Sequence, residues 1–195
     1  MSLSILLLGF GVGLLIMVPP GPVSVTLLEV GVTQGRSAGV RSGAGIAAGD
    51  VVVGTLAAMI IIAGGMLPDA MFDGVRFASA AILVGLGVFL VVRPATVEAV
   101  AGAIQRPARA LFLLTVLTPT VLGAWIAMLA ALPFSNSPAD VAMFVIGVCV
   151  ASAIWHTALG TLAAELGHRL HGATARIARA GGLTMIGFGI AGFAG

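Results

Sequence analysis

Long apolar stretches alternate with short polar connections along the whole chain. The apolar stretches cover about residues 3–32, 42–66, 75–92, 108–132, 139–163 and 177–195. A helix needs about 20 apolar residues to cross the hydrocarbon core of a bilayer, and most of these stretches supply them. No connection is long enough to fold as a separate soluble domain. The pattern predicts an all-α integral membrane protein of about six transmembrane helices, forming a single transmembrane domain over residues 1–195.

Prolines interrupt two of the apolar stretches. The interruptions are Pro19-Pro20-Gly21-Pro22 in the first stretch and Thr118-Pro119-Thr120 in the fourth. Proline removes a backbone donor and breaks or kinks a helix, and such backbone is tolerated at membrane depth only where protein or a water-filled cavity satisfies it. The breaks occupy corresponding positions in the halves, at about 1–92 and 106–195. They therefore predict an inverted repeat of three plus three helices, with a site where the broken helices meet.

The amino-acid composition also indicates that most of the protein surface faces lipid instead of water. Charged residues make up 8% of the chain and hydrophobic residues 59%, whereas a soluble domain carries about 25% charged residues. A net charge of +2 is too small for a nucleic-acid-binding surface. The single cysteine, Cys149, excludes an intrachain disulfide and a thiolate metal cluster. We expect no cofactor, no resident metal and no nucleic-acid partner.

The arginines predict the orientation. All of them except Arg76 lie in or beside the first, third and fifth connections, which the positive-inside rule makes cytoplasmic. Both termini are then extracytoplasmic, and the protein is a multi-pass protein of the cell (inner) membrane. The first apolar stretch lacks the positively charged start and the cleavage site of a secretory signal, so we expect it to be retained.

Two ionisable residues lie well inside apolar stretches. Asp50 follows Arg41 by about nine residues, which places it roughly 13 Å along the second helix, and His156 is about 12 Å from the cytoplasmic end of the fifth. An ionisable residue at such depth costs about 2.5–3.5 kcal/mol and by default indicates a functional site. The alternative interpretation is that each forms a satisfied hydrogen bond between packed helices.

Glycines recur at intervals of four residues in the second stretch. Gly39 with Gly43, and Gly45 with Gly49, form two such pairs. Small residues at this spacing let helix backbones approach closely. We expect them to pack the second helix, and to hold Asp50 against the broken first helix.

Residues 20–50 resemble the amino-terminal signature of the LysE-type amino-acid exporters, which include lysine, homoserine and threonine efflux proteins. The signature reads here as Pro20-Gly21-Pro22, then Gly31, Gly35 and Gly39, then Gly49-Asp50. The similarity continues with a proline-broken fourth helix, Trp155 deep in the fifth, and Gly182 and Gly187 in the sixth. Members of the family typically place Asn before the second-break proline and often Lys after it, where this chain has Thr118 and Thr120.

The resemblance implies secondary export of amino acids or similar small zwitterions from the cytoplasm, driven by exchange with protons. In that interpretation Asp50 carries the coupling proton, and His156 is the candidate for a second residue that transfers this proton. The substrate-binding residues are then Pro20, Gly21, Pro22, Ser24, Thr118, Pro119, Thr120 and Trp155. The partners are the small solute, protons and membrane lipid, with a homo-oligomer left open.

Three other interpretations stay open. One is a metal-cation exporter of the same superfamily, for which Asp50, His156 and Cys149 are a thin set of ligands. Another is an intramembrane enzyme with Asp50 and His156 as acid and base, although no glycine-framed nucleophile is present. The last is a structural membrane protein. Because the lysine-free chain has no phosphate-binding loop, it is not expected to hydrolyse ATP. We expect the protein not to be an enzyme.

Overall fold

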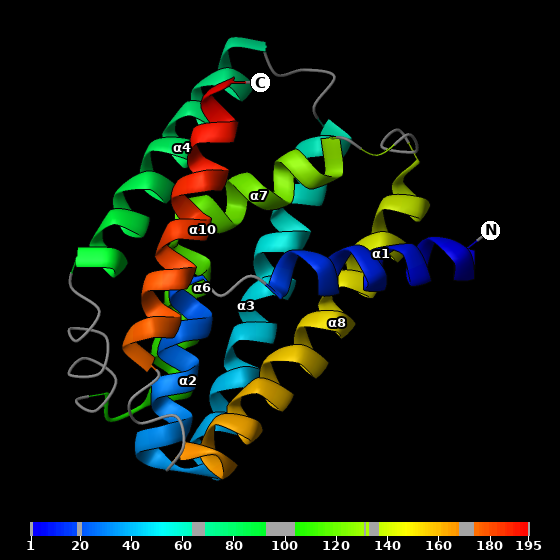
Figure 1. Cartoon of the computed structure of the whole chain (residues 1–195). Helices are drawn as coiled ribbons and strands as arrows, with labels where there is room; N and C mark the ends of the chain where they lie inside the picture. Colours follow the sequence, from blue (N-terminus) through cyan, green and yellow to red (C-terminus); the bar gives the residue numbers. More distant parts are fainter. Residues whose placement is uncertain are drawn as a thin grey trace.

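The computed structural model describes residues 2–18, 21–63, 69–92, 104–130, 132, 137–167 and 174–194. Every secondary-structure element in these ranges is an α-helix, which confirms the predicted all-α class for the described residues (Figure 1). The helices are α1 (Ser2–Met17), α2 (Pro22–Gln34), α3 (Arg36–Ala63), α4 (Asp69–Val92), α6 (Pro107–Leu117), α7 (Pro119–Ala130), α8 (Pro138–Glu165) and α10 (Thr174–Ala194).

Helices α3 and α8 form the centre of the structure, side by side and antiparallel (Figure 1). Their backbones nearly touch. A Cβ atom placed on Gly43 would lie 2.6 Å from the carbonyl oxygen of His156, and one placed on Gly160 would lie 2.5 Å from the carbonyl oxygen of Gly39. Contacts this short leave no room for any side chain larger than hydrogen. The register of α3 on α8 is therefore set by glycine.

The second glycine pair of α3 faces a different helix. A Cβ atom on Gly45 would collide with the carbonyl group of Ala108, and one on Gly49 would lie 2.8 Å from the Cβ atom of Thr115. Both partners belong to α6. The predicted packing role of the two glycine pairs is confirmed. Gly39 and Gly43 allow α8 to approach α3 closely, whereas Gly45 and Gly49 allow the close approach of α6.

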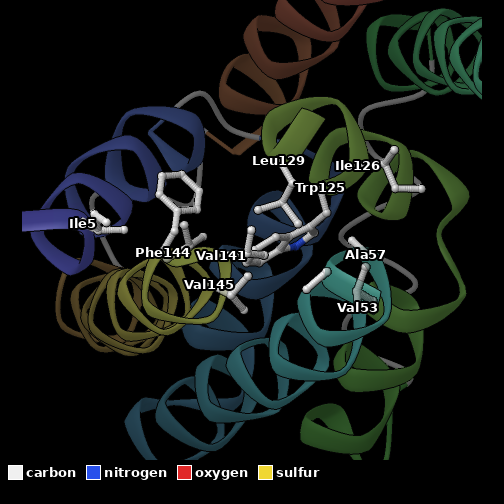
Figure 2. Packing of buried hydrophobic residues seen from close by; sticks show 11 residues of the cluster. Ile5, Val53, Ala57, Trp125, Ile126, Leu129, Val141, Phe144 and Val145 are labelled. Carbon is white, nitrogen blue, oxygen red and sulfur yellow. The ribbon is translucent and has the colours of Figure 1, made fainter. Parts of the chain in front are cut away.

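Helix α1 crosses the first half of α8 and closes the main apolar core. Ile5 packs there with Val141, Phe144 and Val145 of α8, and Trp125 and Leu129 of α7 complete the cluster (Figure 2). Phe144, Leu129 and Val141 are fully buried. Gly9 and Gly147 allow this crossing, because a Cβ atom on either would strike the backbone of the other helix.

Helices α4 and α10 form a second close pair beside this centre (Figure 1). A Cβ atom on Gly87 would lie 2.5 Å from the carbonyl oxygen of Gly182, and one on Gly189 would lie 2.8 Å from that of Ala80. The rings of Phe77 and Phe193 stack further along the same interface, with centroids 6.0 Å apart. Small residues again set the distance between helices.

The two apolar stretches that contain prolines are each divided into two described helices. In the first, α1 ends at Met17 and α2 begins at Pro22; Pro19 and Pro20 lie outside the described residues. In the fourth, α6 ends at Leu117 and α7 begins at Pro119, and the two are bent by 53° relative to each other.

The polar connection between the first two apolar stretches, residues 33–41, is almost entirely helical. The chain turns at Gly35 alone, whose φ of 82° belongs to the left-handed region that favours glycine. Arg36 already begins α3, and the Arg41 guanidinium donates to the Ser37 carbonyl oxygen within the helix. Polarity indicates where the lipid ends, whereas a helix continues as long as its backbone bonds can form.

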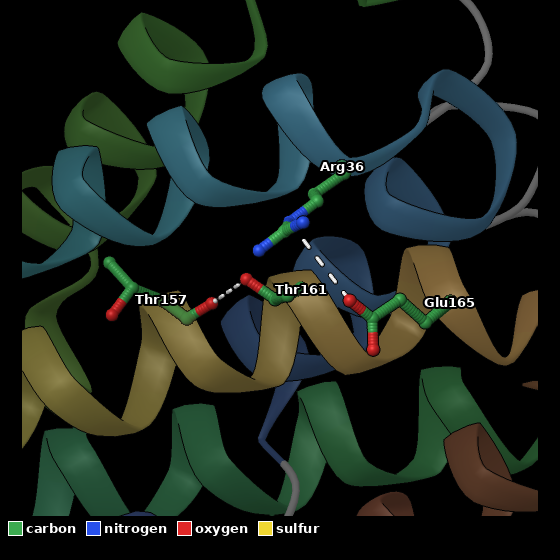
Figure 3. Close-up of polar contacts among 4 residues, drawn as sticks. All are labelled: Arg36, Thr157, Thr161 and Glu165. Carbon is green, nitrogen blue, oxygen red and sulfur yellow. Dashed lines mark hydrogen bonds and ion pairs between the residues drawn. The ribbon is translucent and has the colours of Figure 1, made fainter.

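Two described helices, α3 and α8, are each 28 residues long and apolar enough to cross a membrane. The bent pair of α6 and α7 is long and apolar enough to form a third span if the two helices together count as one. The start of α3 meets the end of α8, where Arg36 Nε lies 4.0 Å from Glu165 Oε1 (Figure 3). Both side chains are exposed, so this ion pair contributes at most about 1 kcal/mol.

We predict that Gly43→Ala destabilises the protein, because its methyl group would push α8 away from α3. Overpacking of this kind costs about 1–3 kcal/mol, and a lower thermal unfolding temperature in detergent would reveal it. Gly85→Ala in α4 is the matched control, since a Cβ atom there meets nothing within 4 Å. That control should be neutral or stabilising by about 0.5–1 kcal/mol. Equal unfolding temperatures for the two variants would contradict the close approach.

Candidate functional site

A cavity of about 520 Å³ lies among the central helices. The segments that line it belong to α1, α2, α3, α6, α7, α8 and α10, so it gathers both divided stretches and the two central helices. Small-molecule sites typically occupy about 300–1,000 Å³. Most of its lining side chains are apolar, among them Ile46, Met128, Val148 and Met185.

Asp50 and His156 are the only ionisable side chains among the described residues that line the cavity. They come from α3 and α8, and their exposed fractions are only 6% and 5%. No Arg lines the described wall. Among the described lining residues, His156 is the one whose side chain can carry a positive charge beside Asp50.

Ser152 joins these two residues. Its hydroxyl group donates to Oδ2 of Asp50 over 2.5 Å, and the same oxygen lies 3.1 Å from Nδ1 of His156. Nδ1 also lies 3.1 Å from the backbone carbonyl oxygen of Ser152, one helical turn earlier. Ser152 is completely buried. Asp50, Ser152 and His156, named the Asp-Ser-His chain below, form a continuous hydrogen-bonded path between α3 and α8.

Close contacts between helices determine the position of the Asp-Ser-His chain. Gly43 abuts the backbone of His156, which holds α8 close enough for Ser152 to reach Asp50 two turns further along α3. The Trp125 indole of α7 also contacts the Asp50 carboxyl group. A Cβ atom on Gly54, one turn past Asp50, would lie 2.8 Å from the Trp125 ring. Glycine thus makes room for both partners of Asp50.

The threonines that line the cavity use their hydroxyl protons within their own helices. Thr115 donates to the carbonyl oxygen of Leu111, Thr118 to that of Leu114, and Thr184 to that of Ala180. Their lone pairs remain available as acceptors. These side chains can receive hydrogen bonds from an ammonium group, but they cannot at the same time donate to a carboxylate.

Donors to the cavity come from the start of α2. Gly21, with an extended backbone, caps this helix without a side-chain hydrogen bond, and Gly21, Val23 and Ser24 all line the cavity. The first hydrogen bond of the helix runs from the Val25 amide to the Gly21 carbonyl oxygen. The amides of Val23 and Ser24 precede it, so they carry the partial positive charge of a helix N-terminus.

The structure brings together five of the residues predicted for the site: Gly21, Ser24, Asp50, Thr118 and His156 all line the cavity. Pro20 lies outside the described residues, as do the side chains of Pro22, Pro119 and Thr120. Trp155 is absent from the described lining, and its Nε1 atom is buried without a hydrogen-bond partner among the described residues. Its predicted role in substrate binding stays a prediction.

Several lining residues escaped the sequence analysis. Thr115, Thr184 and Met185 line the cavity, but nothing in the order of residues distinguishes them from other apolar or weakly polar positions. Trp125 also lines it; its depth in the fourth stretch is compatible with either a packing role or a pocket wall, and the sequence does not separate the two. Ser152 carried a signal that was overlooked. It precedes His156 by four residues, so the two share a helix face and can interact.

Comparison with known proteins agrees with this architecture. The family model described as LysE type translocator matches residues 14–192. No curated protein and no solved structure matches the chain significantly. The matched region contains both proline-containing breaks, the central pair α3 and α8 and every residue that lines the cavity except Gly13. The chain therefore belongs to the LysE type translocator family of membrane transporters, as the resemblance in its sequence predicted.

Proposed function

We propose that this protein exports neutral amino acids, or similar small zwitterions with an apolar side chain, from the cytoplasm in exchange for protons. The observation that carries the proposal is the chemistry of the cavity, an apolar chamber with one buried acid and a helix N-terminus in its lining. The proposal also places the protein in the cell (inner) membrane, with both of its termini on the extracytoplasmic side.

The chemistry of the wall suits both ends of a zwitterion. Asp50 and the lone pairs of Thr115, Thr118 and Thr184 accept hydrogen bonds, as an ammonium group requires. The amides at the start of α2 donate hydrogen bonds and attract a carboxylate. The remaining wall is mostly apolar and has no described Arg, which favours an uncharged side chain.

Coupling arises because proton and substrate compete for Asp50. A charged carboxylate that is buried away from water needs a positive partner, and either an ammonium group or a proton can neutralise it. Protonation from the outer side would displace the ammonium group there. Loss of that proton to the cytoplasm would prepare Asp50 for the next substrate. The result is antiport of substrate against protons.

The pairing of helices supports the inverted repeat that this mechanism needs. With α1, α2, α3 and α4 matched to α6, α7, α8 and α10, the contact of α1 with α8 corresponds to that of α6 with α3. The contact of α2 with α8 likewise corresponds to that of α7 with α3, and that of α4 with α7 to that of α10 with α2. Transporters with such repeats alternate access by moving one repeat against the other.

The other interpretations fit the cavity less well. Within the described ranges no group of three or more His, Cys, Asp and Glu side chains could hold a metal ion. The Asp-Ser-His chain contains the residue types of a hydrolase triad in the wrong order, because Ser152 lies between the other two and donates to Asp50. In a triad the imidazole accepts the serine proton. Ser152 is also fully buried, out of reach of an attacking position.

Asp50→Asn should abolish proton-driven export, because the amide keeps the size of the carboxyl group but cannot titrate. The measurement is uptake of labelled L-leucine, L-methionine and L-phenylalanine into everted membrane vesicles with an acidic lumen. Exchange of internal for external amino acid without a gradient should persist at a reduced rate in the variant, because the amide oxygen still accepts a hydrogen bond from the ammonium group but carries no charge. Glu165→Gln, which alters an exposed acid of α8, should leave driven uptake within about twofold of the unmodified protein. Undiminished driven uptake by Asp50→Asn would refute the role of this carboxyl group.

Ala124→Phe should block transport by filling the cavity. Both Ala124 and Ala127, one turn further along α7, are exposed, but Ala124 lines the cavity and Ala127 is absent from the described lining. We expect uptake of the same amino acids to fall about tenfold or more in Ala124→Phe, since a bulky ring would occupy the substrate volume. Ala127→Phe should behave as the unmodified protein. Equal rates for the two variants would place the substrate path elsewhere.

Single cysteines should report the predicted orientation. On a Cys149→Ser background, Ser37→Cys at the start of α3 should resist a membrane-impermeant maleimide in intact cells, because the arginine-rich side is cytoplasmic. Ala139→Cys at the start of α8 should react. Both positions are exposed, so access to the reagent decides the labelling. The opposite pattern would invert the topology and turn the proposed exporter around.

A further inference from the structure

We propose that Ser152 passes the coupling proton between His156 and Asp50, so that the Asp-Ser-His chain works as a proton relay. This inference rests on the proposed proton-coupled function and adds a residue that neither the sequence nor the family assigns. It is carried by geometry. The serine oxygen lies within hydrogen-bond distance of both titratable groups of the cavity, and the serine itself is sealed from solvent.

The acceptors determine where the hydrogens lie. The backbone carbonyl oxygen of Ser152 can only accept, so the proton of a neutral imidazole at this site belongs on Nδ1, 3.1 Å away. The Ser152 hydroxyl donates to Asp50, which leaves its lone pairs directed at that same Nδ1–H group. Both hydrogen bonds then point the same way: His156 donates to Ser152, and Ser152 donates to an ionised Asp50. Such chains polarise each bond in turn.

The relay step follows from this order. A proton that binds Nε2 of His156 makes the ring an imidazolium. The Nδ1–H bond breaks as that proton passes to Oγ of Ser152, while the Oγ–H bond breaks and its proton passes to Oδ2 of Asp50. Serine ends as a neutral hydroxyl, histidine as the Nε2–H tautomer and aspartate as the neutral acid. One proton has entered and one carboxylate has been neutralised, so the step is balanced without another reactant.

The backbone of α8 resets the relay. After the step, the unprotonated Nδ1 atom faces the lone pairs of the Ser152 carbonyl oxygen 3.1 Å away, an unfavourable contact between two acceptors. When Asp50 releases its proton, the transfers run in reverse: Oγ of Ser152 takes the proton from Asp50 and gives its own to Nδ1 of His156, while Nε2 loses its proton. This restores the Nδ1–H tautomer. The carbonyl group thus makes the loaded state transient, which suits a carrier that must give the proton up on the other side.

Few other groups compete for this proton. Asp50 and His156 are the titratable side chains in the described cavity wall. Cys149 of α8 is near enough to interact electrostatically with Asp50, and Glu29 of α2 is buried but does not line the cavity. The polar side chains that other helices contribute to the described lining are hydroxyl groups and the Trp125 indole of α7, which do not titrate in the physiological range.

The test compares two rates in the same everted vesicles. Labelled L-leucine is the probe, with L-methionine as the second substrate. Ser152→Ala should slow uptake driven by an acidic lumen about 100-fold, the lower end of what a positioned proton-transfer group contributes. Exchange of internal for external L-leucine without a gradient should stay within about twofold, because the cavity wall is unchanged. A residue that only packs α8 would slow both rates together.

Ser42→Ala is the matched control. Ser42 is also a fully buried serine of a central helix, but its hydroxyl oxygen has no hydrogen-bond partner among the described residues. We expect both rates to be those of the unmodified protein. Ser152→Cys retains a weaker donor of similar size and should give an intermediate driven rate, and it replaces Ser152→Ala if the alanine variant does not fold. His156→Gln combined with Ser152→Ala should be no slower than either single change, because both interrupt one path.

The outcomes separate the two proposals. If the unmodified protein shows no proton-driven uptake, the proposed function fails. If it does, and Ser152→Ala keeps driven uptake within about twofold, the relay is overturned while the function stands. Equal losses of driven uptake and of exchange would also overturn the relay, because they indicate a structural role. Selective loss of driven uptake in Ser152→Ala, with Ser42→Ala unaffected, supports it.

Discussion

The rest of the structure depends on the close approach of the α3 and α8 backbones. Lipid is as apolar as the helices, so no hydrophobic force drives these two helices together, and close packing must hold them. Gly39, Gly43 and Gly160 permit that packing at two successive turns. The bond from Ser152 to Asp50 exists only at this separation. The same glycines that stabilise the bundle therefore create the buried polar chain.

The cavity shows how a membrane protein can keep a charge away from lipid without neutralising it permanently. Asp50 has a hydroxyl donor from α8 and an indole contact from α7, but no described arginine faces it. A permanent ion pair would satisfy the carboxyl group and remove its capacity to exchange partners. Neutral donors stabilise the carboxyl group while leaving room for a proton or an ammonium group. That arrangement suits a site that must be loaded and emptied in turn.

In the proposed function, the threonines and the start of α2 recognise different groups of the substrate. Hydroxyl groups bonded to their own helices present lone pairs, whereas the start of α2 presents amide hydrogens. The division follows from the direction of the peptide dipoles: carbonyl groups point toward the C-terminal end of a helix and amides toward its N-terminal end. A break inside an apolar stretch exposes an end of this kind in the middle of the bundle, where a small solute can reach it.

The sequence by itself determined the class of the protein. Apolar length, scarce charge and the glycine spacing around Pro20-Gly21-Pro22 and Asp50 predicted a helical membrane protein of the family that the comparison confirms. These properties are local, since the solvent around a helix determines its composition. Asp50 and His156 stood out for the same reason, because ionisable residues are rare in apolar stretches. Only the tertiary structure decided that Ser152 joins them, that Trp125 lines the cavity, and that each glycine pair of α3 packs against a different neighbouring helix. Those facts depend on the rotation and register of one helix against another, and a one-dimensional pattern of serines, tryptophans and glycines is compatible with many registers.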